Sequence, residues 1–392
     1  MTLNYAKLTL YFLLLSFTAI AQQANTGQTL VSAYTAVDKV ALSIPGSQTG
    51  STQQIADYVT ANFKADSDKA RAIFMWVASN IQYDVANMRS AENKIAINNR
   101  QDVEDKIASV LNTRKGICVH YALLFNDICS KCGLRSYVIT GYTREHGAIA
   151  KMKHAWCVTR IDRNWFLMDP TWGAGHISHG AFVPVIRDSF YKVPPRQFVS
   201  SHMPFDPMWE CLNHPVANQE FIDGNTAENM ASQLFSYADS IDAYQKLDSM
   251  EQCRAARRRL AANGVKHSLL ANQLQVLDRT LDMHRSNSEA AIYNENQDTY
   301  KSAVTDYNDG VSNVKKFLQY QNAKTAPGAD MQQATDTAYA LLTRAKQKLQ
   351  SIKKPDADLA QQIASTLKLI DDVMAQAEEQ KGWLLKNATK EK

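Results

Sequence analysis

The stretch that decides the fold is RKGICVHYALLFNDIC, residues 114–129. Gly116 permits a sharp backbone turn, and the apolar residues after it recur as on a helix that packs on more than one side and ends before Gly133. Cys118 then lies in the first turn, where free N–H groups and the helix dipole favour a thiolate. The two basic residues before Gly116 add positive charge. A buried structural cysteine is the alternative, because cysteine is among the residue types most often buried.

Two later segments have the composition of neighbouring β-strands. Residues 154–161 (HAWCVTRI) are followed by a polar turn and by residues 164–169 (NWFLMD), which Pro170 ends. Residues directly opposite one another on an antiparallel pair share a face. If the loop has two residues, Asp169 and His154 become diagonal neighbours within about 7–8 Å between Cα atoms. An odd loop would separate them, so we predict a loop of two or four residues.

Cysteine, histidine and aspartate in this order suit a thiol acyl-transfer enzyme. Such chemistry needs a thiolate nucleophile, an imidazole that takes and returns a proton, and a carboxylate that orients the imidazole. We therefore predict that Cys118 is the nucleophile, His154 the general base and acid, and Asp169 the orienting carboxylate.

Several motifs resemble the transglutaminase-like superfamily, the papain-related thiol enzymes. These are Gly-x-Cys followed by Tyr-Ala, then His-Ala-Trp, then a strand that ends in Asp-Pro-Thr-Trp. Residues 70–84 resemble the helix and Tyr-Asp that precede the nucleophile in many members, and residues 198–209 (FVSSHMPFDPMW) are similar to a tail in the branch containing the kyphoscoliosis peptidase. The resemblance covers residues 70–222.

This resemblance implies an α+β fold with a papain/transglutaminase-like core, in which the nucleophile helix packs on an antiparallel sheet. It assigns the same roles to Cys118, His154 and Asp169. It leaves the reaction open, because members include transglutaminases, peptidases, amidases and inactive relatives. We expect no metal and no organic cofactor, since none is needed for this chemistry.

Three aromatic residues are candidates for the wall or oxyanion hole of the site. The backbone N–H of Cys118 is the natural first oxyanion donor, and Trp76 or Tyr83 could supply the second. Trp76 lies on an apolar helix face, where a core role is the more common one. Trp172 is expected to shield His154 and Asp169 from water, although a core role fits its position as well.

The start of the chain is typical of a secretory signal peptide. Lys7 precedes an apolar run of about 13 residues, too short to span a membrane, and Ala-Ile-Ala precedes the expected cleavage after Ala21. We therefore expect a periplasmic or secreted protein with no membrane span in its mature form. Residues 22–53 are rich in Gln, Thr, Ser and Gly and predict an extended segment and linker. The catalytic domain is predicted over residues 54–222.

Charge and cysteine usage limit the partners. The net charge of +4 is too small to indicate a nucleic-acid partner. A protein or peptide substrate, such as a cell-wall peptide, fits the predicted chemistry and compartment. Cys129 and Cys132 lie one helical turn apart and could pair with each other in an oxidising compartment, or serve a redox or zinc role, although the second half of a zinc motif is missing.

Residues 226–392 predict an antiparallel helical bundle. Breaks at Asn263-Gly264, residues 326–328 and Lys354-Pro355 separate four helices, and the long second one is expected to bend near Ser286 to Ser288. The first apolar seam comprises Met230, Leu234, Tyr237, Ile241 and Tyr244. A later seam comprises Tyr300, Val304, Tyr307, Val311, Val314 and Leu318. Such seams must be buried against other helices, and the region is interpreted as a spacer, docking module or self-association module.

The sequence as a whole predicts a cysteine-dependent enzyme that cleaves amide or peptide bonds, most simply a hydrolase. A cross-linking transglutaminase and a non-catalytic binding module that keeps the fold are the alternatives. They differ in whether Cys118 reacts and in whether an amine or water resolves the acyl-enzyme.

Overall fold

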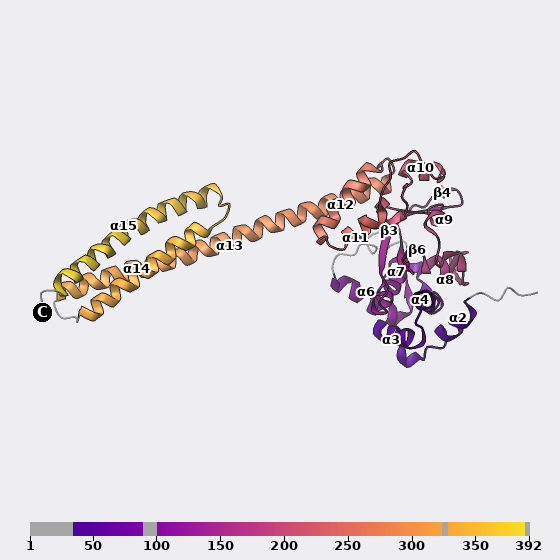
Figure 1. The fold of residues 1–392 in the computed structure, drawn as a ribbon, viewed down its shortest axis with the longest axis horizontal. Coiled ribbons are helices and arrows are strands. Elements are labelled where there is room, and N and C mark those ends of the chain that lie inside the picture. Colours follow the sequence, from indigo (N-terminus) through magenta and orange to yellow (C-terminus); the bar gives the residue numbers. More distant parts are fainter. Residues whose placement is uncertain (1–33, 89–99, 324–327, 389–392) are drawn as a thin grey trace, which may run out of the picture. The chain divides into compact units, whose positions relative to one another are not determined.

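The computed structural model describes residues 34–88, 100–323 and 328–388 of the 392-residue chain (Figure 1). The predicted signal peptide lies outside the described residues. The chain divides into two compact units, the first reaching Asp248 and resuming over Ala255–Leu274, the second comprising Ser249–Arg254 and the chain from Gln275 onward.

The first unit combines helices with strands that pair antiparallel, except for the first two strands, which pair with each other in parallel. Its α-helices are α2 (Thr35–Ala41), α3 (Thr52–Asn62), α4 (Asp66–Asn80), α5 (Val85–Met88), α6 (Arg100–Thr113), α7 (Cys118–Lys131), α8 (Pro170–Ala174), α9 (Pro195–Phe198), α10 (Asn218–Asp223) and α11 (Tyr237–Tyr244). Its strands are β1 (Gln82–Tyr83), β2 (Lys115–Gly116), β3 (Ser136–Glu145), β4 (Ala148–Ile149), β5 (His154–Ile161), β6 (Asn164–Met168), β7 (Gly175–Ser178), β8 (Ala181–Pro184) and β9 (His202–Pro204). Short 3-10 helices are η1 (Gly46–Gln48), η3 (Asp188–Phe190) and η4 (Pro207–Glu210).

Helix α7 forms where the glycine turn and apolar run predicted it. It begins at Cys118, and Gly133 beyond its end has a φ of 80°, which glycine adopts without strain. The N–H of Ile117 donates to Nδ1 of His120 at 3.1 Å, which satisfies one donor at the helix start. The thiol of Cys157 in β5 donates to the carbonyl of Ala122 at 3.2 Å. The helix that begins at Cys118 therefore packs directly on the sheet.

The main sheet has the strand order β4-β3-β5-β6, and β9 also pairs with β3. The β5–β6 hairpin has the predicted two-residue loop, because Ile161 pairs with Asn164. Asp162 and Arg163 in the loop both have positive φ, as a two-residue hairpin turn requires. This register places the residue after β6, Asp169, opposite the residue two positions beyond the start of β5. The predicted α+β fold class is confirmed.

The sheet separates two apolar clusters. Alternate residues of β5 enter different clusters: Cys157 packs with α4 and α7, whereas Trp156 packs with residues of α9, η4 and α11. This alternation follows from the two-residue period of a strand. His154 and the residue after β6, Asp169, therefore share the strand face of Trp156, opposite to that of Cys157.

The N-terminal segment is more ordered than predicted. Within its described part, α2 and η1 replace the expected extended chain, and α3 already begins at Thr52. Ala41 is fully buried in the first core. The guanidinium of Arg71 donates to both carboxylate oxygens of Asp38 at 2.7 Å. The polar composition of this segment hid a short helix whose stability comes from tertiary packing rather than from local propensity.

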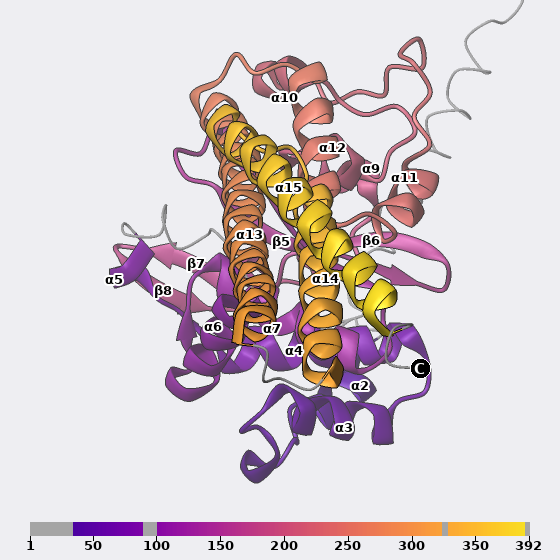
Figure 2. The same ribbon diagram turned by 90° about the vertical axis from the view of Figure 1, so that its left-hand side faces the viewer.

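The second unit consists mainly of three long helices that run side by side in Figures 1 and 2: the later turns of α13, α14 and α15. The helices that enter it are α12 (Ser249–Ala262), α13 (Ser268–Ala323), α14 (Gly328–Ser351) and α15 (Ala357–Ala388). The predicted breaks after Ala262 and around Pro355 are present. In α14 the apolar residues spaced three or four positions apart are buried, with Ala338, Leu342 and Ala345 fully inaccessible and Leu349 2% exposed.

Three details of the predicted bundle are wrong. Residues 226–248 belong to the first unit: Met230 and Leu234 are 70% and 69% exposed, and Ile241 packs in the second cluster of the sheet. Helix α13 continues without interruption through residues 286–288. The predicted apolar seam of α13 ends at Leu318, but the buried residue there is Phe317, which is 1% exposed, whereas Leu318 is 45% exposed. Short-range periodicity identified a stripe but did not specify which neighbour covers it.

Among the helices of the described ranges, none is both long enough and apolar enough to cross a membrane.

Candidate active site

Three different elements bring the predicted triad together. Cys118 is the first residue of α7, His154 is the first residue of β5, and Asp169 follows β6 and precedes α8. Nε2 of His154 lies 2.7 Å from Oδ2 of Asp169. The Cys118 side chain lies close enough to the same imidazole to raise its pKa. Because Nε2 is engaged by Asp169, Nδ1 is the nitrogen left for the sulfur. Thiol, imidazole and carboxylate thus lie together.

The electrostatics of His154 favour its charged form. Burial by itself lowers the pKa of the ring, but the Asp169 carboxylate and the Cys118 side chain outweigh burial and raise this pKa to about 10. Burial by itself raises the pKa of Asp169, but His154 and His202 hold it well below its usual range. Both groups are therefore charged at neutral pH, which a buried site tolerates only when the charges are paired.

Asp169 accepts four hydrogen bonds while it is fully buried. Its Oδ1 accepts the backbone N–H groups of Thr171 and Trp172 at 2.8 and 3.1 Å. Its Oδ2 lies 2.7 Å from Nε2 of His154 and 3.2 Å from Nε2 of His202. The first pair arises because Asp169 caps α8, with Pro170 at the first helical position.

His202 is the site residue that sequence reasoning missed. It lies in β9, which pairs with β3 so that His202 is opposite Thr143. Only its place in the tail motif marked it, and that motif carried no chemical meaning. The strands β3 and β9 are almost sixty residues apart in the sequence, and their pairing places the imidazole of His202 against Asp169. Local sequence patterns could not predict this contact.

The three aromatic candidates have different positions. Trp76 is 1% exposed in the first core, with the Arg114 guanidinium 5.1 Å from its ring centre, which is the core position considered above. Tyr83 in β1 pairs with Gly116, and its pKa is raised by burial and by the nearby Cys118 and Asp169. Trp172 lies beside the imidazole of His154, with ring centres 5.6 Å apart. Tyr83 and Trp172 therefore line the site, and Trp76 packs within the core.

Of the two basic residues expected to add positive charge near Cys118, Arg114 makes its contacts with other residues. The guanidinium of Arg114 donates to the backbone and side-chain oxygens of Thr49, both at 2.9 Å, and lies over Trp76. The positive φ of 54° at Arg114 lets the chain leave α6 and enter β2 just before the nucleophile.

His154, Asp169 and His202 are also the group of described residues whose spacing comes nearest to a metal site, with ligand atoms within 4.8 Å of one another. The 2.7 and 3.2 Å separations to Asp169 are hydrogen-bond distances. A cation would have to displace the protons that lie along these contacts. The arrangement fits a hydrogen-bonded carboxylate better than an ion site.

Residues 53–170 match the model of the transglutaminase-like superfamily. This part of the chain is a transglutaminase-like domain. The chain is 28% identical over 164 residues to the human kyphoscoliosis peptidase, covering 40% of this chain and 23% of that protein. It is 22% identical over 205 residues to hillarin of Drosophila melanogaster, covering 47% of this chain and 24% of hillarin. The chain therefore spans about a quarter of the length of these relatives.

A solved structure of a TGase is also similar to the chain. It has 19% sequence identity and a TM-score of 0.25, and the match covers 47% of this chain and 41% of that one.

Proposed function

We propose that the transglutaminase-like domain is a cysteine-dependent acyl-transfer enzyme that acts on amide or peptide bonds, with hydrolysis as its main reaction. The observation that carries this proposal is the grouping of Cys118, His154 and Asp169, in which Nε2 of the imidazole contacts the carboxylate and the nearby Cys118 side chain raises the pKa of the imidazole. The name of the human relative, a peptidase, agrees with this reaction class.

In the proposed reaction, His154 holds the proton of the Cys118 thiol, so that a thiolate faces the substrate. The sulfur attacks the amide carbonyl, and the backbone N–H of Cys118 stabilises the oxyanion that forms. His154 gives its proton to the departing amine as the C–N bond breaks, leaving a thioester. Water then attacks the thioester, gives a proton to His154, and releases a carboxylic acid and the thiolate. Asp169 keeps the imidazole oriented through both steps.

We further propose that the substrate is a protein or peptide outside the cytoplasm, such as a cell-wall peptide. The support is the N-terminal sequence, with its short apolar run before Ala-Ile-Ala. N-terminal sequencing of the protein secreted by its own host should give Gln22 as the first residue. An intact Met1 in a cytoplasmic fraction would contradict this location.

One observation favours a non-catalytic binding module as the second candidate: Cys118 is only 3% exposed. A nucleophile must meet its substrate, so an active enzyme has to admit a carbonyl carbon to this sulfur. Two polar side chains lie close to it, however, because Cys118 raises the pKa of both His154 and Tyr83. A binding module would retain this geometry without reacting.

Alkylation separates the two candidates. The mature protein is treated with iodoacetamide at pH 7, and the modified cysteines are mapped by mass spectrometry over time. If the protein is an enzyme, iodoacetamide should modify Cys118 faster than Cys253, although Cys253 is the more exposed of the two. If Cys118 reacts no faster than Cys253, the binding module is favoured.

A second assay distinguishes hydrolysis from cross-linking. The protein is incubated with a glutamine-bearing protein and a labelled primary amine, and with cell-wall peptides. Release of new carboxyl groups without incorporation of the amine supports the hydrolase. Incorporation of the amine that depends on Cys118 would instead indicate a transglutaminase.

We propose a docking or self-association role for the helices of the second unit, since the candidate triad and the His154–Asp169–His202 cluster both lie in the first unit. Light scattering of the full chain over a range of concentrations tests self-association directly. A mass equal to one chain at every concentration would leave docking to another protein as the proposed role.

A further inference from the structure

We infer that His202 is a positioning residue of this site: its neutral imidazole donates Nε2–H to Oδ2 of Asp169 and holds the carboxylate oxygen that orients His154. The inference rests on the proposed acyl-transfer function, and it assigns a role to a side chain outside the predicted triad.

The hydrogen bonds of Asp169 show what His202 adds. Two backbone N–H groups fix Oδ1, and they come from the same short helix that Asp169 caps. Without His202, Oδ2 would have His154 as its one partner among the described side chains that contact it. A carboxylate held on one side can still pivot about its Cβ–Cγ bond. The second donor on Oδ2 comes from β9, a separate element, and therefore fixes the carboxylate plane.

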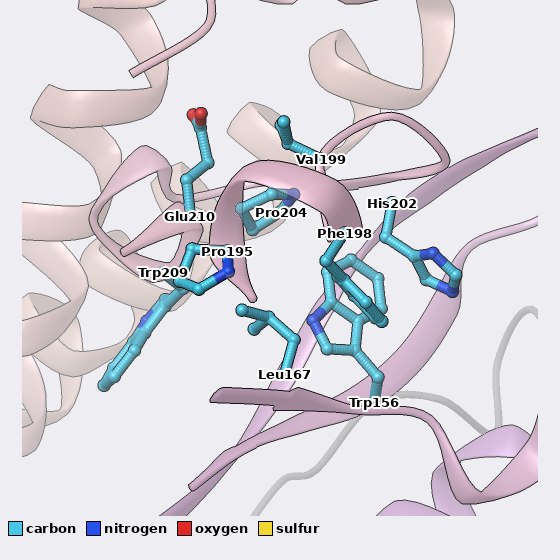
Figure 3. Close-up of a pocket in the computed structure, with 9 residues that line it drawn as sticks. All are labelled: Trp156, Leu167, Pro195, Phe198, Val199, His202, Pro204, Trp209 and Glu210. Carbon is cyan, nitrogen blue, oxygen red and sulfur yellow. The ribbon is translucent and has the colours of Figure 1, made fainter. Parts of the chain in front are cut away.

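The surroundings of His202 keep it neutral. Its ring stacks on Phe198 with centres 4.0 Å apart, and Trp156 lies edge-on at 5.2 Å (Figure 3). Trp172 also lies edge-on, with ring centres 4.5 Å apart. His202 is 1% exposed. This burial lowers its pKa to about 4, even though Asp169 acts in the opposite direction. Three aromatic rings thus offer no solvation for a second positive charge beside His154.

The tautomer follows from the other ring nitrogen. Nδ1 of His202 lies 2.8 Å from Oγ of Ser201, whose hydroxyl can donate to it. A neutral imidazole has one N–H, so with Nδ1 as acceptor the hydrogen is on Nε2, which faces Asp169. The two imidazoles on one carboxylate therefore differ: His154 carries the positive charge and takes part in proton transfer, whereas His202 donates a hydrogen bond and keeps its proton.

Two substitutions separate donation from packing. His202→Phe keeps an aromatic ring in the cage and removes the donor. His202→Gln loses the ring and retains an N–H₂ group near the position of Nε2. We expect His202→Phe to slow alkylation of Cys118 at pH 7 by about tenfold, the size of one hydrogen bond to a charged group, and His202→Gln to stay within about threefold of wild type.

The order of the two variants decides the question. If His202 only fills space, Phe should be the milder change and Gln the harsher one, and that order would overturn the inference. An unchanged rate in His202→Phe would also overturn it. His214→Gln is the matched control, because His214 hydrogen-bonds to Ser232 in the same unit and makes no contact with Asp169 in the described structure. Thermal unfolding of each variant shows whether it is folded.

A measurement on the unmodified protein covers the case in which a variant does not fold or Cys118 does not react. Nitrogen-15 spectra of histidine-labelled protein report the charge and tautomer of each ring. We expect His202 to be neutral with its hydrogen on Nε2 from pH 5 to pH 8, and its signal is assigned by its loss in His202→Gln. A charged ring, or the hydrogen on Nδ1, would refute the role. If His202 has the expected tautomer but Cys118 of the wild-type protein is alkylated slowly, the result would instead count against the proposed enzyme.

Discussion

Buried charge is handled differently in the two units. In the first unit, Asp169 is fully buried and receives donors from β5, β9 and the start of α8. In the second unit, the Asp306 carboxylate is paired with Arg344 and Lys348 of one neighbouring helix, and Arg344 remains 57% exposed. The first arrangement requires several elements to converge, whereas the second requires only two adjacent helices.

This difference indicates which cluster of charged residues is the better candidate for a reactive site. A cluster such as that of Asp306 fixes how two helices align, and solvent shares in neutralising its charges. The Asp169 cluster excludes solvent and pairs a charged imidazole with a carboxylate next to a thiol. Such an arrangement costs desolvation energy and is retained where a reaction or a binding event depends on it. Four predictions test whether the two units differ in this way.

The largest effect is expected from Cys118→Ala. Loss of the sulfur removes the covalent step, so amide hydrolysis should fall by about 10⁴-fold or more. The fold should persist, because the cavity left by one sulfur is small. Cys211→Ala, which removes another buried thiol of the same unit, serves as the control and should retain activity. Measurable hydrolysis by Cys118→Ala at the wild-type rate would mean that the triad is not the site.

The next effect concerns Asp169→Asn. The amide can still accept from the α8 backbone, but its N–H₂ group would face the two Nε2 donors, so the tautomer of His154 is no longer fixed. We expect hydrolysis to fall by about 10³- to 10⁴-fold. Asp242→Asn is the matched surface control, since Asp242 is 62% exposed and pairs with Arg135. Equal rates for the two variants would contradict the orienting role.

A third prediction concerns the second unit. Leu342 is fully buried in α14, and Leu342→Ala should lower the free energy of unfolding of the helical region by about 3 kcal/mol. The rate of Cys118 alkylation should not change. Leu385→Ala, at a 73% exposed position, is the control for stability. A slower alkylation rate in folded Leu342→Ala would show that the reactivity of Cys118 depends on the helical region.

The smallest effect is a pH dependence of stability. The pKa of His154 is raised from 6.5 to about 10, so its contribution to stability is complete below pH 6.5 and is lost as the pH rises through 10. The pKa of His202 is lowered to about 4, so its contribution is present above pH 6.5 and is lost as the pH falls through 4. We expect changes of a few kcal/mol. Denaturant unfolding of wild type and His154→Gln should converge near pH 10; parallel curves would contradict the assignment.

Much of the fold could be predicted from local pattern. Side chains alternate between the two faces of β5 and β6, and this alternation, together with a two-residue loop, was enough to place His154 and Asp169 on one face. The glycine turn before Cys118 placed the start of α7. Local pattern gave the wrong prediction where tertiary packing determines the structure. Helix α2 forms from a polar segment because Ala41 is buried in the core and because Arg71 pairs with Asp38. Helix α13 continues through residues 286–288 although these residues are exposed, so a shift in the apolar periodicity does not by itself end a helix.

The chain's own sequence determined which residues could react and in what order they occur, because turn chemistry and strand periodicity act over a few residues. Only the tertiary structure decided that His202 would share the carboxylate of Asp169, that Trp76 would lie in the core and that Cys118 would be nearly covered. These outcomes depend on contacts between segments far apart in the chain. Their free energies come from burial and paired charge in the assembled domain, which no short stretch of sequence contains.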